Sequence, residues 1–167
     1  MAPPPAVVAP APATPAPASP PATPATPARQ RVCVECAPGE KAQWGEASIG
    51  GGATSGCPAD LRQRLEAVAL SGDFDALSSE IGAGCRAIRV DLPAGARFTG
   101  FRYEASSRGV VADCMPGRDC PAGAARFPFE PVIRKEGGRT TLLVGFESTA
   151  ADWRNALVAG YWSLAKK

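Results

Sequence analysis

Short apolar runs with the two-residue spacing of β-strands make up most of residues 85–164. Successive side chains of a strand point to opposite faces, so apolar residues at alternate positions predict a strand with one buried face. Residues 155–164 show this alternation, and residues 140–146 are apolar on both faces, which predicts a central strand covered on both sides. Turn residues such as Gly137-Gly138 separate the runs. The pattern favours an antiparallel β-sandwich-like domain of five to seven strands.

Residues 97–105 are expected to form one of these strands. Its alternation places Thr99, Phe101 and Tyr103 on one face and Phe98 on the opposite face. The remaining expected strands are residues 88–92, the short stretch Val110-Val111, and residues 127–133, which Pro128 and Pro131 mark as an edge or bulged strand.

Before the strands, residues 58–81 have the spacing of two short helices joined as a hairpin. Pro58 suits the start of the first helix, and Gly72 suits its end. The first helix has one apolar stripe, formed by Leu61, Leu65, Val68 and Ala69. The second is expected to bury Phe74, Leu77 and Ile81. The predicted fold class is therefore α+β, mainly β, with a helical hairpin ahead of the sandwich.

The first 28 residues differ from the rest in composition. They hold eleven of the chain's 18 prolines and no charged or aromatic side chain. Proline fixes φ and has no N–H, so neither a helix nor a sheet ladder is expected there. We expect a disordered Pro/Ala-rich spacer over residues 1–28 and a single cysteine-containing domain over residues 29–167. This layout is similar to that of bacterial envelope proteins.

The absence of histidine excludes several classes of function. Ser-His-Asp and Cys-His nucleophiles and histidine-ligated metals all need this side chain. The net charge of +2 is spread without basic blocks, which argues against nucleic acid as a partner. No run reaches the roughly 18 to 20 apolar residues that span a bilayer, and no signal-peptide pattern is present. If the protein is exported, we expect its signal or anchor to lie outside this sequence.

Six cysteines are the most specific feature of the chain. An even set in a domain of this size favours structural disulfides, which require an oxidising compartment. Cys114 and Cys120 flank a turn-rich loop, and Cys57 and Cys85 bracket the helical hairpin, so each pair is expected to bond. Cys33 and Cys36 remain. A swap, with Cys36 bonded to Cys57 and Cys33 bonded to Cys85, is an open alternative.

Two other interpretations compete with structural disulfides and a non-catalytic role. Cys33-x-x-Cys36 has the spacing of half a zinc site, with Cys114 and Cys120 as a loose second half, so a small zinc-stabilised interaction domain is one alternative. A carboxylate-dependent enzyme acting on the cell envelope is the other. Its candidate pairs are Asp73 with Asp75, and Asp113 with Asp119. We expect these pairs to be a helix cap and part of a solvated loop, and we expect no cofactor and no enzyme activity.

The binding residues we predict lie in two connections. Met115, Arg118 and Asp119 belong to the loop closed by Cys114 and Cys120, and Trp153 precedes the last strand. A loop closed by a disulfide loses less entropy on binding than an open loop. The sequence therefore predicts a non-catalytic binding or assembly module of an exported envelope or surface protein. Its partner is expected to be a protein or glycan, and its location periplasmic or extracellular.

Overall fold

The computed structural model describes residues 1–3, 36–50, 55–78, 80–107, 109–121, 125–148 and 154–164. The chain divides into two units, Met1–Val32 and Cys33–Lys167. The second unit holds all the helices and strands of the described residues. The spacer predicted over residues 1–28 lies outside the described residues, apart from residues 1–3.

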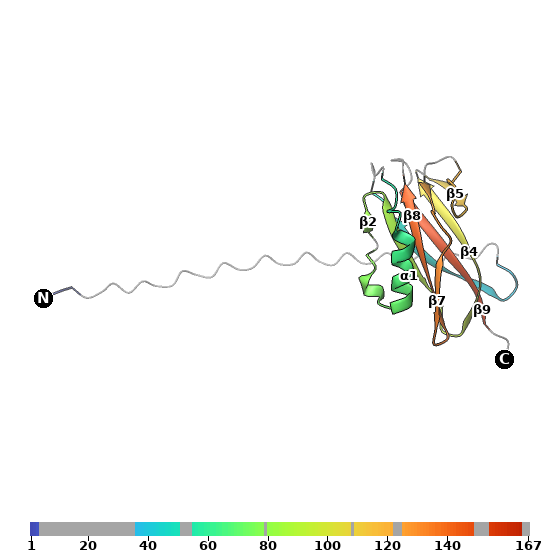
Figure 1. Ribbon diagram of the computed structural model, residues 1–167, viewed down its shortest axis with the longest axis horizontal. Helices are drawn as coiled ribbons and strands as arrows, with labels where there is room; N and C mark the ends of the chain where they lie inside the picture. The colour runs from blue at the N-terminus through green and yellow to red at the C-terminus, as the bar shows by residue number, and fades with distance from the viewer. Residues whose placement is uncertain are drawn as a thin grey trace. The chain divides into compact units, whose positions relative to one another are not determined.

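Two antiparallel sheets form the second unit (Figure 1). The first sheet has the order β1-β9-β4-β5, with β1 at Glu40–Ser48, β9 at Asn155–Leu164, β4 at Ala96–Ser107 and β5 at Val110–Cys114. The second has the order β2-β3-β8-β6, with β2 at Glu80–Gly82, β3 at Cys85–Asp91, β8 at Arg139–Ser148 and β6 at Ala125–Arg126; β7, at Val132–Glu136, also pairs with β8. The predicted α+β, mainly β class is confirmed. The described residues hold nine strands rather than five to seven.

The main core lies between the two sheets. It is built from the alternate, apolar side chains of β3, β4, β8 and β9, and its largest fully buried members include Tyr103, Phe127 and Phe146. Tyr103 stacks on Phe127, with ring centroids 4.3 Å apart, and Phe127 also contacts the ring of Phe146. Stacked aromatic rings of this kind bury a large apolar area in one place.

A second, smaller core lies on the outer face of the second sheet. Helix α1, at Leu61–Ser71, packs there against β7 and β8 and buries Leu61, Leu65 and Ala69, as its predicted stripe requires (Figure 1). Leu143 of β8 belongs to this core, whereas Leu142 and Val144 belong to the core between the sheets. The prediction of a central strand with two apolar faces is thus confirmed for β8.

The hairpin's second helix is formed only in part. Residues Phe74–Ala76 make one 3₁₀ turn, η1, and the chain then becomes extended at Leu77 and enters β2. The guanidinium of Arg89 lies 4.1 Å from the centroid of the Phe74 ring and makes a cation–π contact with it. Pairing of β2 with β3 thus outweighs the weak helical preference of this short segment.

Strand β4 departs from the predicted alternation. Its register with β9 shifts between Phe98 and Gly100, which is a β-bulge. A bulge changes which side chains share a face. Phe98 and Phe101, expected on opposite faces, therefore both pack against the core between the sheets, while Thr99 donates a hydrogen bond to Glu40 of β1.

Strand β1 has no counterpart among the predicted strands, because residues 40–48 have no clear pattern of their own. It pairs with β9 along its whole length, from Glu40 opposite Ser163 to Ser48 opposite Asn155. At Gly45 it also approaches β3 of the other sheet, where a methyl group on Gly45 would lie 2.7 Å from Val90 Cγ2 and 2.9 Å from the carbonyl oxygen of Arg89. The missing side chain lets the two sheets meet at this edge.

We predict that Gly45→Ala destabilises the fold by about 1–3 kcal/mol, because the added methyl overpacks a site with backbone on one side. Gly82→Ala in β2 is the control, since no atom lies within 4 Å of the methyl it would add. Urea unfolding of both variants measures the difference. Equal stability of the two would contradict the close approach of β1 to β3.

Candidate binding site beside the disulfide loop

The disulfides connect the pairs that the spacing of the sequence predicted. Cys57 bonds Cys85, with Cα atoms 4.8 Å apart, and Cys114 bonds Cys120, with Cα atoms 4.7 Å apart. Cys36 is disulfide-bonded as well, and Cys33 lies outside the described residues. The swapped pairing is therefore wrong. The zinc interpretation also loses its second half, because Cys114 and Cys120 are joined to each other and offer no thiolate to a metal.

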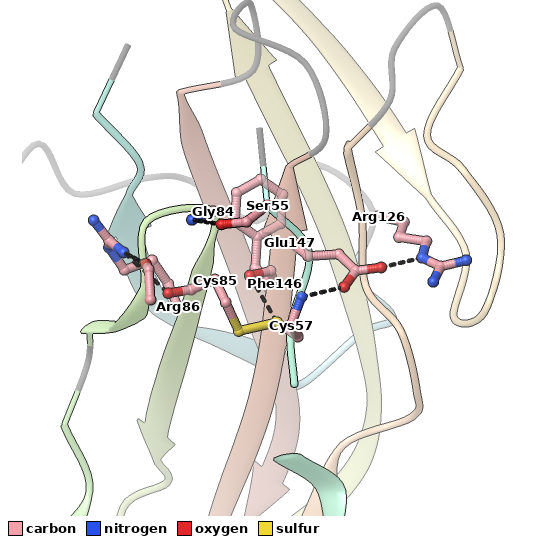
Figure 2. The surroundings of a disulfide bond; sticks show 9 residues. Ser55, Cys57, Gly84, Cys85, Arg86, Arg126, Phe146 and Glu147 are labelled. Carbon is pink, nitrogen blue, oxygen red and sulfur yellow. Dashed lines mark hydrogen bonds and ion pairs between the residues drawn. A yellow bond between two sulfur atoms is a disulfide. The ribbon is translucent and has the colours of Figure 1, made fainter. Parts of the chain in front are cut away.

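A polar network centred on one buried carboxylate lies beside the disulfide between Cys57 and Cys85 (Figure 2). Glu147 is only 3% exposed, and its Oε2 accepts a hydrogen bond of 2.6 Å from the backbone N–H of Cys57. Its Oε1 accepts a hydrogen bond from Arg126, and that bond raises the pKa of the Arg126 guanidinium. Both carboxylate oxygens are thus engaged, so the network holds the chain that leads into α1 rather than exposing an acid.

The loop between Cys114 and Cys120 is fixed by backbone hydrogen bonds as well as by its disulfide. Gly117 donates to the carbonyl of Phe127 at 2.8 Å, and Cys120 donates to the carbonyl of Ala125 at 2.7 Å. Arg118 and Asp119 are exposed at its tip, and Met115 is 65% exposed. Figure 1 shows this loop following β5. These bonds fix both ends of the loop and one position within it.

This loop determines where β5 ends. Strand β5 pairs with β4 only from Tyr103 opposite Cys114 to Ser107 opposite Val110. Beyond Cys114 the chain turns away at Met115 and Pro116, and proline has no N–H with which to continue a ladder. The step between the end of β5 and the longer β4 leaves a hollow of about 390 Å³, lined by Phe101, Arg102, Tyr103, Asp113, Cys114, Met115, Pro116 and Tyr161. We call this hollow the β4–β5 notch.

A fixed cation lies in the notch. Arg102 Nη2 is 2.7 Å from Asp113 Oδ1 and 3.4 Å from Glu104 Oε1. The hydrogen bond from Arg102 to Asp113 is the main reason why the pKa of Arg102 is raised further. Asp113, one of the possible catalytic acids, is therefore already paired. An aromatic rim, a flexible thioether and an oriented Arg–Asp pair can bind a polar ligand that has some apolar surface.

Comparisons of the chain with models of protein families, with curated proteins and with solved structures gave no match. No helix in the described residues is both long and apolar enough to cross a membrane.

The predicted binding residues are only partly brought together. Met115 lines the notch, whereas Arg118 and Asp119 are not among its lining residues. Asp119 instead forms an isolated antiparallel β-bridge with Arg126 through its backbone. Trp153 lies outside the described residues. Sequence reasoning did not place Phe101 or Arg102 at a binding site. The difference in length between the run at residues 97–105 and the short Val110-Val111 run was the one signal that could have indicated them.

Tyr103 forms part of the wall of the notch and has an unusual hydroxyl. The residue is 1% exposed, and in the described part of the chain its Oη has no hydrogen-bond partner. Burial is the main reason why the pKa of this phenol is raised. A buried hydroxyl without a partner opposes folding, since water would have bonded it in the unfolded chain.

We predict that Tyr103→Phe stabilises the fold by about 1 kcal/mol, because it removes the unbonded hydroxyl and keeps the ring stacked on Phe127. Tyr161→Phe is the matched control: its hydroxyl is hydrogen-bonded to Arg102, so its loss should not stabilise. Chemical denaturation provides the comparison. A Tyr103→Phe protein less stable than the parent would show that the hydroxyl is satisfied.

We also predict that Glu147→Gln destabilises the fold by about 1–3 kcal/mol, since the amide has only one acceptor oxygen, so either Arg126 or the Cys57 N–H would face its NH2 group and lose its hydrogen bond. Glu66→Gln is the control, because Glu66 pairs with Arg62 on the exposed face of α1, and such surface pairs contribute about 0.2–1 kcal/mol. Thermal unfolding of oxidised protein measures both. A loss at Glu147 no larger than that at Glu66 would contradict the anchoring role.

Proposed function

We propose that this protein is a non-catalytic binding or assembly module of an exported envelope or surface protein. The observation that carries the proposal is the β4–β5 notch, a polar and aromatic hollow bordered by a loop that a disulfide and three backbone hydrogen bonds hold in place. A surface ordered before binding loses little conformational entropy when a partner arrives.

The compartment follows from the chemistry of the cysteines. The two disulfides of the described residues, together with the bonded Cys36, are typical of proteins that fold in an oxidising environment. We assign the protein to the periplasm or the cell exterior on this basis. We propose that residues 1–28, which hold eleven prolines and no charged side chain, act as a spacer.

The kind of partner follows from the lining of the notch. Arg102 offers a planar, permanently charged donor group, and Tyr161, Phe101 and Met115 offer apolar contact area. Aromatic residues, methionine and arginine are the types enriched at protein interfaces. We propose a protein or glycan of the envelope as partner. A carboxylate-dependent enzyme is the less favoured function, because Asp113 and Glu147 are each engaged by an arginine.

A photo-crosslinking amino acid tests the proposal in the cells that produce the protein. We predict that p-benzoylphenylalanine at position 115 forms a defined adduct with an envelope component on irradiation, because Met115 lies at the rim of the notch and is 65% exposed. Gel mobility and mass spectrometry identify the adduct, and protease treatment distinguishes a protein from a glycan.

The matched control places the same amino acid at Leu70, an 86% exposed residue of α1. It should give no defined adduct, because α1 packs on the other sheet. The same adducts at both positions, or none at position 115, would refute a binding role for the notch.

A further inference from the structure

Strand β4 has an open edge below the notch. It extends from Ala96 to Ser107 and pairs with β9 over nearly its whole length, yet β5 covers its other edge only from Tyr103 onward. Along residues 96–102 no strand of the described residues pairs with that edge (Figure 1). An open edge presents backbone N–H and C=O groups at alternate residues and is a ready template for another strand.

The opposite sheet shows the same vacant position. Ile133 of β7 pairs with Leu142, whose side chain lies in the core between the sheets, so Ile133 faces the first sheet. It is nevertheless 40% exposed, and Lys135, on the same face, is exposed too. On the first sheet, Phe98 and Phe101 of β4 are only partly buried, and Phe98 lines a hollow together with Lys135. One strand beside β4 would cover all of these side chains.

Two hollows mark the ends of this vacant position. The β4–β5 notch lies at the end near Tyr103, which we call the upper end. At the end near Ala96, the lower end, a second hollow of about 370 Å³ lies between the start of β4 and the turn that joins β7 to β8. Its lining includes Ala96, Arg97, Phe98, Lys135 and Arg139. A strand lying along residues 96–102 would connect the two.

We propose that the partner engages this protein as an extended peptide strand that adds to β4 along residues 96–102, with acidic side chains at the end near Arg97. The proposal rests on the binding function inferred above and names the class of its ligand. Backbone hydrogen bonds to β4 provide the affinity, and the alternate, inward side chains of the peptide cover Phe98, Phe101 and Ile133, as in other strand-addition complexes.

The charge of the lower end favours an acidic peptide. Arg97, Lys135 and Arg139 are exposed there, and none of them has an ion-pair partner in the part of the chain that the structure describes. The nearby Glu136 is already bound to Arg134. Complementary charge at this rim would steer the peptide and fix its direction along β4.

The shape of the opening favours a slender peptide over a second copy of the chain. Beyond Tyr103 the pairing column beside β4 is already filled by β5. If a second copy paired its own β4 antiparallel to this edge, its β5 and disulfide loop would lie on the same side. They would then collide with the turn that precedes Ala96 in the first copy. The chain's own residues 1–28 are poorly suited as well, because their prolines lack N–H groups and they have no acidic side chain.

The test is selection from a phage-displayed library of random dodecapeptides on the full, oxidised chain. Enriched peptides should alternate apolar residues with others and carry Asp or Glu toward one end. The best one is then synthesised, and its binding is measured by fluorescence anisotropy. Methylating its backbone nitrogens at alternate positions should weaken binding about tenfold or more in one register and leave it unchanged in the other, since only one set of N–H groups faces β4.

Charge reversal on the protein provides the second measurement. Arg97→Glu with Lys135→Glu should weaken binding about tenfold or more, whereas Arg64→Glu with Arg154→Glu, which makes the same change at an exposed residue of α1 and at the exposed residue just before β9, should have no effect. The proposal is overturned if no peptide is enriched, if methylation is tolerated in both registers, or if both double variants bind alike.

Three further outcomes distinguish this proposal from a second copy at the edge and from the function it rests on. A dimer of the chain alone in sedimentation experiments, dissociated by the peptide, would show that a second copy occupies the edge and would overturn the proposal. A specific adduct at position 115 in cells, together with failure of the peptide selection, would retain the binding function and reject strand addition. Failure at position 115 with a peptide that obeys both tests would retain strand addition at β4 and reject the notch as the place where the partner binds.

Discussion

Strand β8 is buried on both faces from Thr140 to Ser148, and the arrangement of the other elements depends on this. One face requires the first sheet as a cover, and the other requires helix α1. Because the side chains of a strand alternate, a slip of one residue in the pairing of β8 with β3 would exchange the two faces. Glu147 would then face the core between the sheets and Phe146 would take its place among polar groups. The two covers and the polar network together hold β8 in one register.

The two described disulfides have different consequences. The bond between Cys57 and Cys85 closes the segment that carries α1 and places it beside β3, where Glu147 binds the entering backbone. The bond between Cys114 and Cys120, which are six positions apart in the sequence, closes a loop that turns the chain out of the first sheet. The first bond supports the packing of a core. The second leaves a core partly uncovered, which is the physical origin of the β4–β5 notch.

Edge strands are usually protected in proteins, and β4 shows some of the usual devices. A bulge at Phe98 twists the strand, and Arg97 adds charge to its edge. The partly buried Phe98 and Phe101 are harder to reconcile with protection alone, because they leave apolar area in contact with water. The notch and the open edge therefore both lie along β4, with the disulfide-closed loop at one end and Arg97, Lys135 and Arg139 at the other.

The sequence by itself determined the elements whose own pattern is strong. The alternation in residues 155–164, the two apolar faces of residues 140–146, the stripe of α1 and the pairing of Cys114 with Cys120 all rest on local spacing or on a short loop, whereas the structure decided between Cys57–Cys85 and the swapped pairing. The tertiary structure decided the rest. Strand β1 forms because it pairs with the edge of β9. The second predicted helix does not form in full because residues 80–82 pair with β3 instead. The notch is a difference in length between two neighbouring strands. Such a difference exists only once the strands are paired, because no residue on either strand carries the information alone.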